Sequence, residues 1–481
     1  MLNRLESTDT ILNDSLETIV DKKNTPKALV EELEHASEVG KFTSSHDAEL
    51  LSRITDFEAE SKKVTRIIDY RMMPLFCIFY FVDFLDRANI GNATLGGIHE
   101  DLHLTPKQLS TCISAFYITY IMFEVPSNII LERTSAKVWL SFIMLLWGIM
   151  TLVMAFAQNF TGLIICRLFL GITESGYIPG IIFIMSKAYQ PREFGTRMAI
   201  LLCMSSLSGI VSGPIAYATS FLEGRHGLHG WQYLFIIEGI PTIVLSIASY
   251  FCLFDDVSEV KWLNDEQKAL HRARSTSPVE DHSKAVDFST IKKTLSDWKT
   301  WMFSLVYCLN ALTFTSYTVF APTIIDGFGF PVLTSQLLTA PPHALSAVVV
   351  LIGGFLVDKY NRRGILMLCG FSTAALGYTL LLILKKPWEL YAALFIIPLG
   401  LGLQLSSVVS WAAVNFNDLD VRVIGVAVVV MLGNSGGIVS SYLYPLTDGP
   451  HYYFGNSFNL ICCAVGAASA GLTSYFLYRE Y

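Results

Sequence analysis

The chain has 481 residues, of which 52% are hydrophobic and only 16% charged. Its mean hydropathy of +0.47 lies above that of ordinary globular domains and favours an integral membrane protein. The apolar runs have the length of spanning helices, and the short alternating segments of a membrane β-barrel are not seen. The net charge of −7 comes largely from an acidic N-terminal region, and no basic stretch indicates binding to nucleic acid.

The nine cysteines all lie within apolar runs, where free thiols behave as small hydrophobic side chains. We therefore expect no disulfide framework, no metal site and no cofactor. The spans also carry no nucleophile or ligand cluster of the kind that a membrane enzyme needs, so we expect no enzymatic activity.

The apolar runs predict an all-α polytopic protein with twelve transmembrane helices. Residues 1–70 are polar and acidic and predict a cytosolic, largely disordered tail. Residues 71–253 and 300–481 each predict a six-helix bundle, and the mixed charges of residues 254–299 predict a solvated cytosolic connector. The twelve segments are 72–94, 108–131, 138–158, 162–187, 198–220, 231–253, 300–322, 336–357, 364–384, 388–412, 422–444 and 456–478.

The distribution of Lys and Arg predicts the orientation, because cytosolic loops carry the excess of these residues. The side assigned to the cytosol holds Lys62, Lys63, Arg66, Arg71, Arg133, Lys137, Lys187, Arg192, Arg197, Lys359, Arg362, Arg363 and Arg422; the other side holds only Lys107, Arg225, Lys385 and Lys386. Both termini are therefore expected in the cytosol. Two six-helix halves predict pseudo-symmetric bundles that rock about a site near the bilayer midplane.

The first segment carries three charged residues, Asp83, Asp86 and Arg87. Charges within a span are costly unless they face a protein interior or a water-filled cavity, so a functional role is expected. Asp83 and Arg87 are four residues apart with the acid first, which favours an ion pair on one helix face.

The fourth segment carries Arg167 and Glu174, seven residues and two turns apart on one face, with Gly171 between them. Together with Asp86 and Arg87 they predict a functional cluster of two acids and two bases.

Two further acids are open to more than one interpretation. Glu124 on the second segment is either part of a gate or a hydrogen-bond partner of Asn128. Glu238 on the sixth segment opens a Glu-Gly-x-Pro kink, and a structural role is favoured there.

The loop after the eighth segment reads G-F-L-V-D-K-Y-N-R-R from Gly354, with Asp358, Lys359, Arg362 and Arg363. This resembles the loop signature of the major facilitator superfamily, G-x-x-x-D-[RK]-x-x-R-R. In that interpretation Gly354 permits close helix approach, while Asp358 pairs with the basic residues to close a cytosolic gate. The equivalent loop of the first half, 132–137, departs from the signature.

Four stretches carry a narrower resemblance over nearly all of residues 70–478. D-R-x-N-I-G-N-A from Asp86, E-V-P-S-N from Glu124, R-x-x-x-G-x-x-E-x-G-x-x-P-G from Arg167 and F-I-I-E-G-I-P from Phe235 are similar to the anion:cation symporter family, particularly its fungal allantoate permease branch. The resemblance implies that Arg87 helps to bind a substrate carboxylate, that Asp86 and Glu174 bind protons, and that Arg167 pairs with Glu174.

The polar residues of the second half are neutral or weakly basic. They comprise Asn310, Thr313, Tyr317, His343, Gln404 and Asn434. We expect Asn310, Gln404 and Asn434, together with Arg167 and with Tyr117 on the second segment, to join Arg87 in binding substrate, although each is often a helix-packing residue instead.

The predicted function is proton-coupled uptake of a small organic anion, such as a vitamin-like carboxylate or a ureide, driven by the proton gradient in alternating access. The alternatives are a non-transporting nutrient sensor with the carrier fold and an antiporter or exporter of the same superfamily. The partners expected are the anion, protons and the lipid bilayer. We expect a monomer in the plasma membrane, an internal membrane being the alternative.

Overall fold

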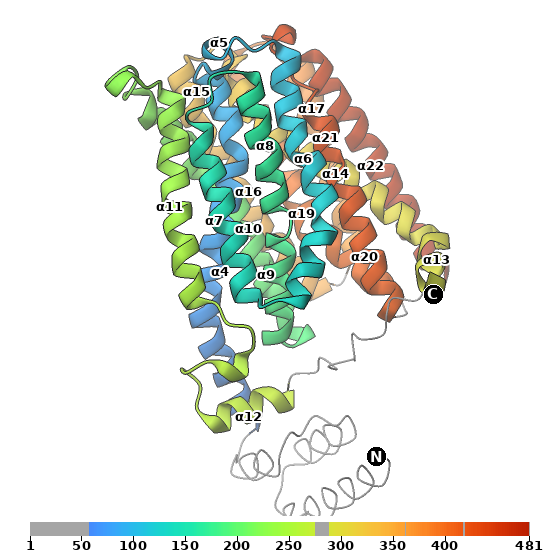
Figure 1. The fold of residues 1–481 in the computed structure, drawn as a ribbon. Helices are drawn as coiled ribbons and strands as arrows, with labels where there is room; N and C mark the ends of the chain where they lie inside the picture. The colour runs from blue at the N-terminus through green and yellow to red at the C-terminus, as the bar shows by residue number, and fades with distance from the viewer. Residues whose placement is uncertain (1–56, 275–287, 361, 417–418, 481) are drawn as a thin grey trace, which may run out of the picture. The chain divides into compact units, whose positions relative to one another are not determined.

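A computed structural model of the protein describes residues 57–274, 288–360, 362–416 and 419–480. Residues 1–56, which form most of the predicted tail, and residues 275–287 of the connector lie outside this part. Every regular element in the described ranges is helical, as predicted (Figure 1).

The helices of the first half are α4 (Phe57–Leu95), α5 (Ile98–Asp101), α6 (Pro106–Arg133), α7 (Ala136–Met154), α8 (Phe160–Glu174), α9 (Tyr177–Ala188), α10 (Pro191–Ser220) and α11 (Gly230–Cys252). The connector contains α12 (Asp265–Arg274) and α13 (Phe288–Ser296). The second half consists of α14 (Trp298–Asp326), α15 (Val332–Leu338), α16 (Ala340–Tyr360), α17 (Arg363–Ile383), α18 (Pro387–Leu394), α19 (Ile396–Asn415), α20 (Leu419–Asn434), α21 (Gly436–Ser440) and α22 (Tyr453–Glu480).

All twelve predicted spans fall on these helices. Ten stretches of the described chain are long and apolar enough to cross a membrane. The other two predicted spans, on α4 and on α20 with α21, are not among these ten, and each has a physical reason. The apolar part of α4 contains Asp83, Asp86 and Arg87, and the apolar helix Ile424–Ser440, in which the single residue Ser435 with helical backbone angles separates α20 from α21, is shorter than the other spans.

Side-chain caps set the starts of several spans. Thr105 forms a capping box with Gln108 before α6, in which each side chain accepts a hydrogen bond from the backbone N–H of the other residue. Asn159 accepts a hydrogen bond from the Gly162 N–H, at 2.9 Å, before α8. These caps satisfy backbone groups that a helix leaves open at its first turn.

Each half packs mainly within itself. In the first half α7 lies against α11 and α8, and α6 lies against α8; in the second half α17 lies against α19 and α22, and α14 against α20 (Figure 1). Glycines permit the close approach: a methyl group at Gly171 would overlap the Phe116 carbonyl of α6. Small residues at helix crossings are typical of membrane bundles, where close backbone approach supplies the packing energy.

The chain forms two compact units. In its described part, the first comprises residues 57–75, 181–194 and 253–274, and the second comprises 76–180, 195–252 and 288–480. Within the first unit the connector residues Val257, Val260, Leu263 and Leu270 are buried. The expectation of a fully solvated connector is wrong for this stretch, because apolar side chains are spaced between its charges. The site described below lies within the second unit.

Candidate functional site

Arg87 on α4 is clamped between two carboxylates. Its Nε lies 2.5 Å from Oε1 of Glu174 at the end of α8, and its Nη2 lies 3.1 Å from Oδ2 of Asp83 one turn earlier on α4. Both acids are fully buried, whereas the Arg87 side chain keeps 14% of its surface exposed. The predicted Asp83–Arg87 ion pair is confirmed. The guanidinium is therefore held in a fixed orientation, and the Arg87 side chain as a whole is not fully buried.

Three aromatic rings surround the same guanidinium. Its central carbon lies 5.0 Å from the ring centroid of Phe84, 5.7 Å from that of Phe116 and 4.8 Å from that of Tyr120. Such contacts stabilise a cation that has lost much of its water. This aromatic group could not be predicted from the sequence, since only Phe84 shares a helix with Arg87 and the other two rings come from α6.

Asp86 is held on a different side of α4. Its Oδ2 accepts a hydrogen bond from Nε1 of Trp147 on α7, at 2.8 Å, and a longer one from the Thr242 hydroxyl on α11, at 3.3 Å. Its Oδ1 is buried without a partner in the described part of the chain. The position of Oδ2 is thus fixed by two hydrogen bonds, while Oδ1 is able to bind a proton.

Arg167 is not paired with Glu174, contrary to what the resemblance implied. The residue is only 2% exposed, and its Nε and Nη2 have no hydrogen-bond partner among the described residues. Glu174 instead bonds Arg87 across the helix interface. A spacing of seven residues places Arg167 and Glu174 on one helix face, but two turns of rise separate them. The Arg87 guanidinium of α4 lies closer to Glu174 and forms the ion pair with it.

Glu238 on α11 is the unexpected member of the cluster. It is 3% exposed, and neither of its carboxylate oxygens has a hydrogen-bond partner in the described chain. The Asn89 amide of α4 is the polar group that approaches this carboxylate, although the two do not lie within ordinary hydrogen-bond distance. A kink residue needs no buried carboxyl group, so burial adds weight to a functional role for Glu238. The sequence signal was present in an acid within a span, but the adjacent Gly-x-Pro kink favoured a structural interpretation.

The acids and bases of this cluster do not balance. Asp83, Asp86, Glu174 and Glu238 are all buried, and they meet two guanidinium groups, those of Arg87 and Arg167. If every one of these groups were ionised, the cluster would carry a surplus of two negative charges. A surplus of that kind is costly in a membrane interior unless protons or another cation neutralise it.

The predicted polar residues of the second half are mostly paired with protein groups. Nδ2 of Asn310 donates to Oε1 of Gln404 at 3.0 Å, and both residues are buried. The Asn434 amide donates to Glu124 of α6 at 3.4 Å, so Glu124 is joined to the opposite half and not to Asn128. The role of Asn310, Gln404 and Asn434 in binding a substrate stays a prediction.

Besides the α6–α20 contact, helices of the two halves meet at several other places in the described part of the chain. On α4 and α14, the Gly91 backbone lies against the Val319 carbonyl; on α6 and α21, the Tyr117 ring lies against Gly437. On α10 and α16, the Ser206 hydroxyl donates to the Ser346 hydroxyl at 3.0 Å. The contacts are glycines and single hydroxyl groups, which part at modest cost.

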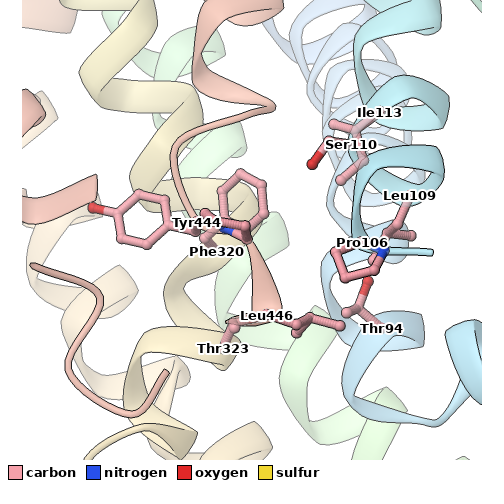
Figure 2. A pocket seen from close by; sticks show the side chains of 10 residues that line it. Thr94, Pro106, Leu109, Ser110, Ile113, Phe320, Thr323, Tyr444 and Leu446 are labelled. Atoms are coloured by element: carbon pink, nitrogen blue, oxygen red, sulfur yellow. The ribbon is translucent and has the colours of Figure 1, made fainter. Parts of the chain in front are cut away.

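A pocket lies between the halves at the end where α4 finishes and α6 begins. Figure 2 shows Phe320, Tyr444 and Leu446 of the second half facing Leu109 and Ser110 of α6. The full lining is Thr94, Pro106, Leu109, Ser110, Ile113, Phe320, Thr323, Tyr444, Pro445 and Leu446. None of these residues is charged, so the pocket is separate in chemistry from the Arg87 cluster.

The predicted gating loop is described only in part. A methyl group at Gly354 would lie 2.5 Å from the Cβ of Ala199, which fits the predicted close approach of α16 to α10. The Asp358 side chain lies outside the described part, so its predicted pairing stays a prediction. Lys359 lies near the Phe355 and Tyr360 rings, Arg362 precedes α17, and Arg363 is its first residue.

The Major Facilitator Superfamily profile matches residues 76–441, a stretch that contains the Arg87 cluster and the gating loop. The chain belongs to this superfamily. It is therefore a multi-pass membrane transporter, because that is what the family comprises. The comparison does not extend to the anion:cation symporter branch.

Curated relatives cover most of the transporter. It is 31% identical to the MFS-type transporter cnsO of Penicillium expansum over 439 residues, which are 88% of this chain and 84% of that protein. It is 30% identical to an uncharacterized transporter of Schizosaccharomyces pombe, over 97% of this chain and 90% of the relative.

Solved structures support the fold of the transporter. A bacterial homolog of the human lysosomal transporter Spinster superposes with a TM-score of 0.68 at 16% identity, covering 85% of this chain and 97% of that one. The xylose transporter XylE of E. coli superposes with a TM-score of 0.63 at 13% identity, over 82% and 96% of the two chains. These similarities establish the predicted two-bundle fold and carry no information on substrate.

Proposed function

We propose that the transporter couples the uptake of a small organic anion to the entry of protons. It acts as a monomer in the plasma membrane, with both termini in the cytosol. It needs no cofactor, and the proton gradient drives transport. This proposed function is that of the anion:cation symporters of the superfamily, which the motifs around Asp86, Arg87, Arg167 and Glu174 resemble.

The observation that carries the proposal is the double clamp on Arg87. An arginine fork suits a carboxylate, and in this structure Glu174 and Asp83 occupy the fork. A proton arriving on Glu174 removes its negative charge and weakens its hold on Nε. A substrate carboxylate then takes the same position, and the exposed part of the Arg87 side chain gives it access.

Coupling follows from this exchange. The substrate anion and the ionised Glu174 compete for one guanidinium, so anion binding favours a protonated Glu174 and proton binding favours the anion. The surplus of buried acids supports the same conclusion, because protons are the simplest ions that neutralise it. The expected substrate is a compact carboxylate with an apolar body that suits the rings of Phe84, Phe116 and Tyr120.

Asp86 and Arg167 are assigned supporting roles. Asp86 has one oxygen fixed by Trp147 and Thr242 and a second without a partner, an arrangement suited to holding a second proton. Arg167 is a buried cation with no ion pair among the described residues, and its charge offsets the acids around it. Rocking of the halves about the contacts of α4, α6 and α10 with α14, α21 and α16 then moves the loaded site from one side of the membrane to the other.

The test is uptake by the purified full-length protein in liposomes with an acidic exterior and a neutral interior. A panel of radiolabelled carboxylates is compared with the same panel in protein-free liposomes, which corrects for passive entry. We expect saturable uptake of at least one carboxylate that collapses when a protonophore removes the gradient.

Two variants separate coupling from binding. Glu174→Gln keeps the shape of the side chain without the ionisable group, and Asp86→Asn does the same for the second acid. The double variant should lose gradient-driven accumulation. Accumulation that ignores the gradient and survives both substitutions contradicts proton coupling, while efflux driven by an inward gradient indicates an antiporter. A protein that binds carboxylates but moves none of them is a sensor.

A further inference from the structure

Glu238 on α11 is a buried acid to which the proposed exchange at Arg87 gives no role. It is only 3% exposed, and neither of its carboxylate oxygens has a hydrogen-bond partner in the described part of the chain. Within that part, no guanidinium or ammonium group pairs with it either. An ionised carboxylate in such a place is costly, because it has lost water and gained neither a donor nor a counter-ion.

The charged group that faces Glu238 is another acid, Asp86 on α4. The two carboxylates repel each other when both are ionised. Helix α7 also packs along α11, but its one charged residue, Lys137, lies over the Tyr250 ring near the far end of α11, 4.7 Å from the ring centroid. Glu238 therefore meets a second acid and no base among the described residues.

The two acids differ in their hydrogen bonds. Oδ2 of Asp86 accepts from Nε1 of Trp147 at 2.8 Å and from the Thr242 hydroxyl at 3.3 Å, whereas the Glu238 carboxylate accepts from neither. The same Thr242 hydroxyl lies 2.9 Å from the backbone carbonyl of Glu238, so it joins Asp86 to the turn of α11 that carries Glu238. Donated hydrogen bonds favour an ionised acid and burial without them favours a neutral one. Of the two, Glu238 is the acid suited to carry a proton.

The donors and acceptors around Asn89 on α4 lead to the same assignment. Asn89 is fully buried, neither atom of its amide has a partner in the described chain, and it is the polar side chain that approaches Glu238. With both acids ionised, Oδ1 of Asp86 and the two oxygens of Glu238 have only this amide as a nearby donor. A proton on Glu238 turns one acceptor into a donor. After side-chain rotation, its O–H reaches Asp86 and its carbonyl oxygen accepts from Asn89.

We infer that Glu238 holds a proton throughout the transport cycle and donates its O–H to Oδ1 of the ionised Asp86. Glu238 is then a positioning residue for Asp86, and this role rests on the proposed function, which assigns a coupling proton to Asp86. When Asp86 binds that proton, the Glu238 O–H turns to the Asn89 carbonyl oxygen. The proton on Glu238 itself is not transported. It reduces the surplus of buried negative charge in the cluster from two to one.

Infrared spectroscopy of the purified full-length protein without substrate tests for this proton directly. Protonated carboxyl groups have a carbonyl stretching band that ionised carboxylates lack, and an ester-free detergent keeps lipid carbonyl groups out of that region. At neutral pH we expect this band in the unchanged protein, and Glu238→Gln should reduce it by the intensity of one carboxyl group. Asp86→Asn should leave it in place, because Glu238 stays buried. Glu132→Gln, at an exposed acid of α6, is the matched control and should also leave it.

Uptake in liposomes tests the O–H as a donor. Glu238→Leu has no donor, so the ionised form of Asp86 is less stable and its proton is released to the cytosol more slowly. Uptake should fall about tenfold, and the pH above which it declines should rise by about one unit. Glu238→Gln, whose amide N–H replaces the O–H, should restore most of the rate and the original pH dependence. Glu238→Met replaces the leucine variant if melting curves show that the latter is not folded.

An infrared band that is the same in the unchanged protein and in Glu238→Gln would overturn the inference, because Glu238 would then be ionised. Equal uptake by the leucine and glutamine variants, with the same pH dependence, would overturn it as well. The infrared result does not depend on transport. A protonated Glu238 in a protein that moves no carboxylate refutes the proposed function, whereas proton-coupled uptake with an ionised Glu238 refutes the inference alone.

Discussion

Nε of Arg87 lies 2.5 Å from Oε1 of Glu174, although 87 positions separate the two residues in the chain. The bond joins α4 to α8 and makes Glu174 the competitor of any anion that approaches the guanidinium. Asp83 holds the other arm of the same fork. A single side chain thereby links the charge state of an acid to the occupancy of an anion site.

Arg87→Lys should reduce uptake by on the order of tenfold or more while the protein still folds. Lysine keeps the positive charge but provides a point charge in place of a planar fork, so it cannot bond Glu174 and Asp83 side by side. Uptake in liposomes and the melting temperature are both measured. Arg133→Lys, at an exposed position at the end of α6, is the control, and uptake close to that of the unchanged protein in both variants would contradict a role for the fork.

Much of the fold could be predicted from the sequence because its signal is local. Run length and loop charge depend on neighbouring residues. All twelve predicted segments fall on helices, and ten stretches of the described chain are long and apolar enough to cross a membrane. The ion pair of Asp83 with Arg87 was also predictable, since both residues lie on one helix face four positions apart. The single turn residue between α20 and α21, Ser435, was less evident, because Ser and Gly there are also compatible with one continuous helix.

The partners of the site residues could not be predicted in the same way. Glu174 is bonded by Arg87 and not by Arg167, and Glu124 is bonded by Asn434 and not by Asn128. In both cases the helical spacing gave a plausible partner on the same element, whereas the observed partner is set by how two helices cross. The same reason hid Trp147 and Thr242, which fix Asp86 from two other helices.

Gly171→Ala should destabilise the first half by roughly 1–3 kcal/mol, the usual cost of inserting a methyl group into a packed interface. The new methyl would overlap the Phe116 carbonyl and the Thr119 hydroxyl of α6, neither of which is free to move away. Melting of the detergent-solubilised protein measures the effect. Gly471→Ala is the control, since its methyl would meet nothing closer than Leu368 at 3.9 Å. Equal melting temperatures for the two variants would refute close packing of α6 on α8.

Glu223→Gln should lower stability slightly at neutral pH, and the difference should vanish in acid. Glu223 lies in the loop before α11. Partial burial acts to raise its pKa, but hydrogen bonds from the Gly230 N–H, at 2.6 Å, and from His229 outweigh this and lower the pKa. The ionised acid is therefore stabilised by folding, and its contribution is present above the pKa of the unfolded chain and is lost as pH falls through the lower folded value.

The effect at Glu223 should stay below about 1 kcal/mol, because the side chain is more than half exposed. Melting curves of both proteins between pH 3 and 8 test this. Glu389→Gln serves as the control, since that acid contacts the exposed Lys386. A difference between Glu223→Gln and the unchanged protein that grows toward acid pH would reverse the sign and rule out the explanation.

Joining the halves across α10 and α16 should stop transport reversibly. The hydroxyl groups of Ser206 and Ser346 lie 3.0 Å apart, so a Ser206→Cys, Ser346→Cys double variant brings two thiols together at a contact that alternating access must loosen. Cys203, which lies next to Ala347 in the same contact, is replaced by Ala in all variants to prevent exchange. Uptake should be near normal in reducing conditions, fall at least tenfold after mild oxidation, and return with a reductant.

Each single-cysteine variant should be insensitive to the oxidant. If the cross-linked protein accumulates substrate at the original rate, the halves do not separate at this contact during the cycle, and the pivot must lie along α10 and α16 themselves.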